Sequence, residues 1–290
     1  MGEIMKRLIL IASLCMLSAQ AYGQEHWGHR LDVEINVPYG EDPAQVADLY
    51  MQAQRPTPGS ALEPLDEPRP TLIWFHGGGW VAGDKASNFN RTVQYVERGW
   101  HVANVNYRIG NGTAPQAVDD AMCAYKWIVD EALRTGRSDR FVVSGGSAGG
   151  HLALMVGLLN AEGNHPCRAD VAPDAIVNWY GITDIAAEDE FLVETGAARN
   201  FAELWVGDRE RLAEISSHYS PLALVTQNAP PIITVHGTAD DTVPYSQAEA
   251  LHAALHTRNR LVTMEGGTHG GFSDSQYEEA IDAIFDFLGE

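Results

Sequence analysis

Positive charge is scarce in this chain of 290 residues. Lys and Arg together number 19 against 39 Asp and Glu, which gives a formal net charge of −20 at pH 7. Nucleic acids and anionic membrane surfaces are bound by basic faces, so this balance argues against both as partners. The charge therefore argues against nucleic-acid binding, but by itself it does not indicate what the protein does.

Apolar runs long enough to cross a membrane are also missing. The run at 8–17 is too short, because a helix that spans a bilayer takes about 20 residues. It follows two basic residues and precedes small ones, which is the order of a secretory signal peptide. Cleavage after Ala21 and after Gly23 both fit. We therefore expect a signal peptide at 1–23, no stable membrane insertion, and a periplasmic or extracellular protein.

Cysteine is rare as well. Of three cysteines, only Cys123 and Cys167 lie beyond the expected signal peptide. An even number in an oxidising compartment favours a disulfide between them, and two free buried thiols are the alternative. Neither has acidic or histidine neighbours at the spacing that zinc needs, and the chain has no HExxH motif. The sequence therefore predicts no metal site and no cofactor.

What the chain has instead is an alternation of short apolar strands with helices. Two alternating segments, 31–40 and 45–54, predict strands joined by a turn, and the Pro-rich stretch 55–70 predicts a surface loop. Further strands are predicted at 71–80, 100–108, 140–145, 174–181, 230–237 and 260–267. Helices are predicted at 114–136, 147–160, 245–257 and 274–290.

This alternation predicts an α/β fold with a mostly parallel sheet and helices on both faces, the first strands being antiparallel at one edge. The stretch at about 182–225 differs, because it is mixed and acidic. We expect it to form a helical, lid-like excursion within one domain that spans 24–290. Functional sites form at the carboxyl ends of such strands, and HGGG, GGSAGG and HGTADD all lie there.

Ser147 is the centre of a G-x-S-x-G motif that directly follows a predicted strand and precedes a helix. A nucleophile on a sharp strand-to-helix turn needs small neighbours, because the backbone there crowds adjacent elements. The N-terminus of the following helix favours developing negative charge. A phosphate-binding loop would instead have a Lys followed by Ser or Thr, whereas His151 and two apolar residues follow here. The motif predicts Ser147 as a nucleophile.

A serine nucleophile needs a base, which an acid orients. Among 11 histidines, His269 stands in a glycine-flanked loop after the last strand, which favours it as the base. We expect His151, inside the helix after the serine, to have a packing role. The acid is expected in the VHGTADDTVP loop, where Asp240 and Asp241 are adjacent and local chemistry does not separate them.

Three consecutive glycines, 77–79, follow His76 at the end of another strand. Backbone N–H groups can stabilise the oxyanion of a tetrahedral intermediate where no side chain blocks the approach, and the N–H of Ala148 supplies a further donor. A glycine-rich turn without function is the alternative. Trp80, next to the glycines, either walls the pocket or packs; we assign it, with Tyr180, to the substrate pocket.

Taken in order, HGGGW, GGSAGG, HGTADDTVP and GGTHGGF resemble the α/β-hydrolase carboxylesterases with an HGGG oxyanion motif. These include the hormone-sensitive-lipase-like esterases. The bacterial feruloyl-esterase-like group is more similar still, because HGGGWVAGDK at 76–85 and NVNYRIG at 104–110 fit its pattern. Many hormone-sensitive-lipase-like enzymes have a longer N-terminal pair of cap helices. This chain has an extended, Pro-rich start instead, so we expect a more open pocket.

The resemblance implies Ser147 as nucleophile, His269 as base, and Asp240 rather than Asp241 as acid. The oxyanion donors that it implies are the backbone N–H groups of Gly78, Gly79 and Ala148. The implied activity is that of an exported serine carboxylic ester hydrolase, acting through an acyl-enzyme on short-chain acyl, acetyl or feruloyl-type esters, small or linked to polysaccharide. Two alternatives stay open. One is an amide hydrolase of the arylformamidase or peptidase kind, and the other is a catalytically inactive binding protein with the same fold.

Overall fold

The computed structural model describes residues 29–54, 60–162 and 164–290. The expected signal peptide at 1–23 lies outside the described residues. The strands are β1 His29–Pro38, β2 Val46–Gln54, β3 Glu63–Pro64, β4 Thr71–Phe75, β5 His101–Val105, β6 Phe141–Gly146, β7 Ala175–Trp179, β8 Ile232–Gly237 and β9 Asn259–Met264. The α-helices are α2 Phe89–Glu97, α3 Gln116–Thr135, α4 Ala148–Glu162, α5 Ile185–Glu194, α6 Phe201–Val206, α7 Leu212–Tyr219, α8 Ser246–Ala254 and α9 Asp274–Leu288.

Within the described residues one nine-stranded sheet runs in the order β1-β2-β5-β4-β6-β7-β8-β9, and β3 pairs with β2 outside this path. β2 is antiparallel to β1, β3 and β5. Every pair from β5 to β9 is parallel. The predicted mostly parallel sheet with antiparallel first strands is confirmed.

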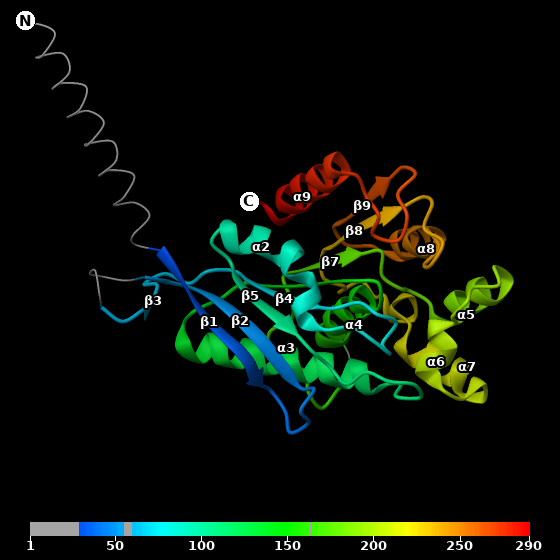
Figure 1. Ribbon diagram of the computed structural model, residues 1–290, viewed down its shortest axis with the longest axis horizontal. Coiled ribbons are helices and arrows are strands. Elements are labelled where there is room, and N and C mark those ends of the chain that lie inside the picture. Colours follow the sequence, from blue (N-terminus) through cyan, green and yellow to red (C-terminus); the bar gives the residue numbers. More distant parts are fainter. Residues whose placement is uncertain (1–28, 55–59, 163) are drawn as a thin grey trace, which may run out of the picture.

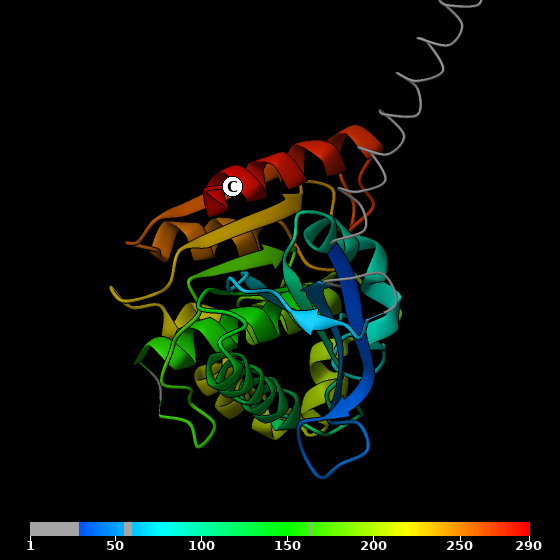
Figure 2. The same cartoon turned by 90° about the vertical axis from the view of Figure 1, so that its left-hand side faces the viewer.

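Helices cover both faces of this sheet (Figures 1 and 2). α3, α4, α6 and α7 contribute buried side chains to one apolar core, whereas α2 and α9 contribute to a second core on the opposite face. Every residue of β4 to β8 is buried. Strands covered on both faces are apolar along their whole length, which explains why these segments do not alternate in the sequence.

Two elements were missed by the sequence analysis. Helix α2 buries Thr92, Tyr95 and Val96 beneath a mostly polar surface. The ring centroid of Tyr95 lies 4.9 Å from that of Phe285 in α9. A helix this short is stabilised by such packing, and here the packing partner is distant in the sequence. The two-residue strand β3 lies within the predicted surface loop, where it adds one short pairing to β2.

The stretch between β7 and β8 contains α5, α6 and α7, with one short 3₁₀ turn between α6 and α7 and another after α7. The side chains of Asp184 and Asn200 cap the first turns of α5 and α6 by accepting backbone N–H groups. These helices lie together at one end of the molecule (Figure 1). They occupy the region for which a helical excursion was predicted.

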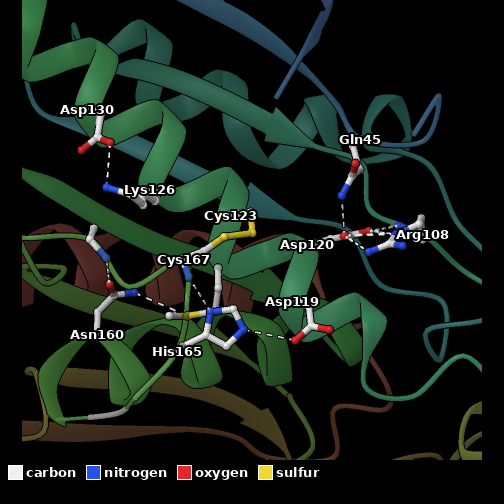
Figure 3. The surroundings of a disulfide bond; sticks show 12 residues. Gln45, Arg108, Asp119, Asp120, Cys123, Lys126, Asp130, Asn160, His165 and Cys167 are labelled. Carbon is white, nitrogen blue, oxygen red and sulfur yellow. Dashed lines mark hydrogen bonds and ion pairs between the residues drawn. A yellow bond between two sulfur atoms is a disulfide. The ribbon is translucent and has the colours of Figure 1, made fainter. Parts of the chain in front are cut away.

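Cys123 of α3 and Cys167, in the connection from α4 to β7, form a disulfide (Figure 3). Beside it, Nδ1 of His165 accepts the backbone N–H of Cys167 at 3.1 Å, and Nε2 of His165 lies 3.1 Å from a carboxylate oxygen of Asp119. The bridge therefore fixes this connection to α3. In the described parts of the chain, none of the helices has the length and apolar character that crossing a membrane requires.

Candidate active site

Ser147 stands on the sharp turn between β6 and α4. Its φ of 58° lies in the left-handed region that residues with side chains rarely adopt. Its N–H donates to the carbonyl of Trp179 at 2.9 Å, and its carbonyl accepts the N–H of His151 at 3.0 Å. Crowding explains the small neighbours, since a Cβ at Gly149 would lie 2.1 Å from the carbonyl oxygen of Phe75. The turn holds the serine in a strained conformation, which is typical of functional residues.

His269 and Asp240 meet where the loops after β9 and β8 come together. Nδ1 of His269 lies 2.8 Å from Oδ2 of Asp240. Since a carboxylate only accepts hydrogen bonds, Nδ1 carries the proton and Nε2 is left as an acceptor. Asp241 is exposed, and its carboxylate accepts the hydroxyl of Thr242 instead. The tertiary structure therefore distinguishes the two adjacent aspartates, because Asp240 contacts His269 and Asp241 contacts Thr242.

The Asp240 carboxylate is buried and fully surrounded by donors. Its Oδ1 accepts the backbone N–H groups of Thr242 and Val243, each at 2.9 Å, and Nε2 of His236 lies 3.3 Å from Oδ2. Burial alone would raise the pKa of this carboxyl, but the hydrogen bonds from His236 and His269 outweigh burial and hold the pKa well below its usual range. Asp240 is therefore charged at every pH near neutrality.

The glycine loop after β4 has no side chains of its own to cover its backbone N–H groups, as its sequence predicted. Gly78 and Gly79 have φ values of 119° and 58°, and a Cβ at Gly79 would lie 2.4 Å from the ring of Phe201. His76 stacks on Tyr107 at 4.2 Å, and its Nδ1 lies 2.7 Å from the carbonyl oxygen of Gly77. His76 therefore braces this loop.

A cavity of about 510 Å³ brings the glycine loop, the serine and the histidine together. Its lining residues are Gly77, Gly78, Gly79, Ala82, Gly146, Ser147, Tyr180, Arg199, Phe201, Thr242 and His269. Ala148 is buried directly beside it at the start of α4. Arg199 and Phe201 come from the helical excursion and were missed by the sequence analysis, because nothing local links that segment to the catalytic motifs.

Trp80 is buried and does not belong to the lining of this cavity. Its indole stacks on Trp205 of α6 at 4.5 Å, and its Nε1–H donates to Nδ1 of His151 at 3.1 Å. Nε2 of His151 donates to the carbonyl of Tyr219 at 2.7 Å, and burial lowers the pKa of His151 to about 4. Trp80 therefore lies in the core rather than in the pocket to which we assigned it. It ties the glycine loop to α4 and to the helical excursion.

Tyr180 does line the cavity, and a cation lies beside its ring. The ring packs edge-on against His269 at 4.8 Å. The guanidinium of Arg91 lies 5.7 Å from the Tyr180 centroid and 5.1 Å from that of Tyr277. Nη2 of Arg91 donates to the Tyr277 hydroxyl at 2.6 Å, and this hydroxyl donates to the carbonyl of Gly270 at 2.7 Å. Arg91 and Tyr277 therefore hold the loop that carries His269.

Glu188, on α5, is a second buried carboxyl near the site. It is 1% exposed, and within the described chain its Oε2 has no hydrogen-bond partner. Burial, and secondly the charge of Asp240, raise its pKa from 4.5 to about 8. Glu188 is therefore largely neutral at pH 7, and no motif signalled it.

A comparison with models of protein families identifies the family to which this chain belongs. The model of the BD-FAE family matches residues 63–255, well over half of the chain. This chain belongs to the BD-FAE family. The resemblance inferred from the HGGG, GGSAGG, HGTADDTVP and GGTHGGF motifs is confirmed.

Relatives of this BD-FAE chain are esterases. Esterase LipC of Mycobacterium tuberculosis is 31% identical over 245 residues, which cover 80% of this chain and 58% of LipC. The chain thus spans little more than half the length of the curated relatives it matches first.

Solved structures share the fold of this BD-FAE chain. A truncated carbohydrate esterase from gut microbiota has a TM-score of 0.70 at 20% identity, covering 89% of this chain and 97% of that one. Esterase 2 of Thermogutta terrifontis, phosphorylated by paraoxon, has a TM-score of 0.64 at 25% identity, covering 89% and 93%. The predicted α/β-hydrolase fold is confirmed.

Proposed function

We propose that this protein is a serine carboxylic ester hydrolase with Ser147 as nucleophile, His269 as base and Asp240 as orienting acid. The observation that carries the proposal is the His269–Asp240 hydrogen bond at one wall of the cavity that Ser147 lines. Two relatives support it. LipC is named an esterase, and the Thermogutta esterase reacts with paraoxon, which phosphorylates activated nucleophiles.

The reaction follows from this arrangement. Nε2 of His269 takes the proton of the Ser147 hydroxyl as its oxygen attacks the ester carbonyl. The backbone N–H groups of Gly78, Gly79 and Ala148 stabilise the oxyanion, and Asp240 stabilises the imidazolium. His269 then returns the proton to the leaving alcohol, which breaks the ester bond and leaves an acyl-serine. Water repeats the two steps on the acyl group and frees the acid and the enzyme.

The substrate class that we propose is short acyl esters, including acetyl and feruloyl-type esters, small or attached to polysaccharide. The cavity supports this, because four of its eleven lining residues are glycines and the only large apolar side chains among them are those of Tyr180 and Phe201. Export through the segment at 1–23 belongs to the same proposal. The disulfide supports it, because such bonds persist in oxidising compartments.

Turnover of p-nitrophenyl acetate, butyrate and octanoate and of a feruloyl ester tests the proposal, with Ser147→Ala beside the wild-type protein. We expect rates that fall as the acyl chain grows and that vanish in the variant. Incubation with paraoxon should add one diethylphosphoryl group to the wild-type protein and none to Ser147→Ala, as read by mass spectrometry. A folded wild-type protein that cleaves p-nitroanilides but none of these esters would overturn the ester reading in favour of amide hydrolysis.

A further inference from the structure

Arg199 places a permanent positive charge in the wall of the active-site cavity. It precedes α6, and its guanidinium carbon lies 5.7 Å from the ring centroid of Phe201. That ring in turn approaches Gly79 so closely that a Cβ there would clash with it. Arg199 therefore belongs to the part of the cavity that adjoins the proposed oxyanion loop, on a segment that the catalytic motifs do not include.

This arginine has no acidic partner within the described chain. No ion pair or hydrogen bond joins it to the residues that the structure places, and none of the cavity's lining residues is a carboxylate. Acidic residues exist nearby, but Arg209 of the same excursion engages them: its guanidinium lies 2.8 Å from Asp189 and 3.6 Å from Glu203. Arg199 is exposed, so its unpaired guanidinium is open to a molecule that enters the cavity.

We propose that Arg199 selects ester substrates that carry a carboxylate in addition to the ester group. This inference rests on the proposed esterase function and names its substrate class more closely. A planar guanidinium binds a carboxylate through two parallel hydrogen bonds, which orients the substrate as well as attracting it. The net charge of −20 otherwise repels anions, so a local cation is needed for an anionic ester to compete with a neutral one.

Two matched pairs of esters test this, each differing by a carboxylate against a carboxamide of the same shape. In p-carboxyphenyl and p-carbamoylphenyl butyrate the group lies on the leaving alcohol. In p-nitrophenyl hydrogen adipate and p-nitrophenyl adipamate it lies on the acyl chain. The ratio of kcat/KM for acid over amide is measured within each protein, so that any general loss of activity in a variant cancels.

We expect an acid-over-amide ratio above one in at least one pair, and the pair that responds identifies the side of the ester that carries the carboxylate. The ratio should fall about 5-fold in Arg199→Gln, mainly through KM, because a partly exposed ion pair contributes at most about that much. Arg199→Lys should keep part of it, and added NaCl should lower it in every protein that keeps a cation at position 199 but not in Arg199→Gln.

Arg134→Gln is the matched control, because Arg134 is an exposed arginine of α3 and its loss changes the net charge equally. Its ratio should equal that of the wild type. A wild-type ratio at or below one in both pairs, or a high ratio that survives in Arg199→Gln, overturns the inference while esterase activity on the amides stands. No turnover of any of the four esters by the folded protein overturns the proposed function and this inference with it.

Discussion

The imidazole of His269 is joined to Asp240 by a hydrogen bond of 2.8 Å, although the two are 29 positions apart along the chain. The neighbouring Asp241 is exposed and takes no part in this contact. Asp240→Asn should lower kcat for p-nitrophenyl butyrate by about 10³–10⁴-fold, because an amide no longer stabilises the imidazolium or fixes the tautomer.

Asp241→Asn is the matched control, since it makes the same change one residue away. Its kcat should stay within about twofold of the wild type, as for other surface substitutions. A larger loss in Asp241→Asn than in Asp240→Asn would reverse the assignment of the acid.

Glu188→Gln should change how stability depends on pH. Because burial raises the pKa of Glu188 to about 8, the folded protein binds one more proton than the unfolded chain between about pH 4.5 and 8. The free energy of unfolding therefore loses up to about 1.4 kcal/mol per pH unit through this group as the pH rises across that window. The neutral glutamine removes the loss, so the variant should gain stability over the wild type at pH 8 and little at pH 5.

Urea unfolding at pH 5, 6, 7 and 8 measures this difference. Glu190→Gln on the same helix serves as the control, because that carboxyl is exposed. Parallel pH profiles for wild type and Glu188→Gln would contradict the raised pKa.

Removing the disulfide should destabilise the protein without touching the catalytic residues. The bridge closes a loop with a sequence separation of 44, and a cross-link of this kind stabilises by about 2–4 kcal/mol, chiefly by restricting the unfolded chain. Thermal unfolding of Cys123→Ser with Cys167→Ser, compared with the oxidised wild type, measures the change. Dithiothreitol should lower the wild-type Tm toward that of the double variant and leave the variant unchanged; an unchanged wild-type Tm would mean that the bridge contributes little.

Arg91→Met should impair turnover by loosening the loop that holds His269. The change removes the donor to the Tyr277 hydroxyl and the cation beside Tyr180. We expect kcat to fall about 10-fold with KM nearly constant, because the loss is one of positioning. Arg91→Lys should restore part of kcat, since it keeps a cation beside the rings.

Arg98→Met is the control for this variant. Arg98 directly follows the same helix, over the ring of Phe285 at 4.2 Å, and is not among the residues that line the cavity. Its kcat should stay close to the wild-type value. Equal losses in Arg91→Met and Arg98→Met would show that α2 acts only through general stability.

The fold and the three catalytic motifs could be predicted because each has a local signature. Apolar segments between glycines and polar turns predict buried strands, and Gly136 ends α3 in the left-handed conformation that a glycine favours. Ser147 was predictable for the same reason, because the crowding of its turn demands small residues at adjacent positions in the sequence. The chain order of serine, acid and histidine narrowed the remaining candidates.

Trp80 shows where such prediction ends. Its place beside the glycines in the sequence made it a pocket candidate, but its indole turns into the core and stacks on Trp205. Burying this large ring against a partner 125 positions later contributes more than exposing it to the cavity. Nothing in the HGGGW motif indicates that Trp205 is the packing partner of Trp80.

By itself, the sequence determined the α/β architecture, the position of the proposed nucleophile and the candidates for its acid and base. Those features depend on periodicity and on small residues at neighbouring positions. The resemblance of the motifs already favoured Asp240 over Asp241. Only the tertiary structure placed Asp240 against His269, put Trp80 in the core, and brought Arg91, Glu188 and Arg199 to the site. These outcomes depend on contacts between segments far apart in the chain, and a contact of that kind leaves no periodic trace in either segment.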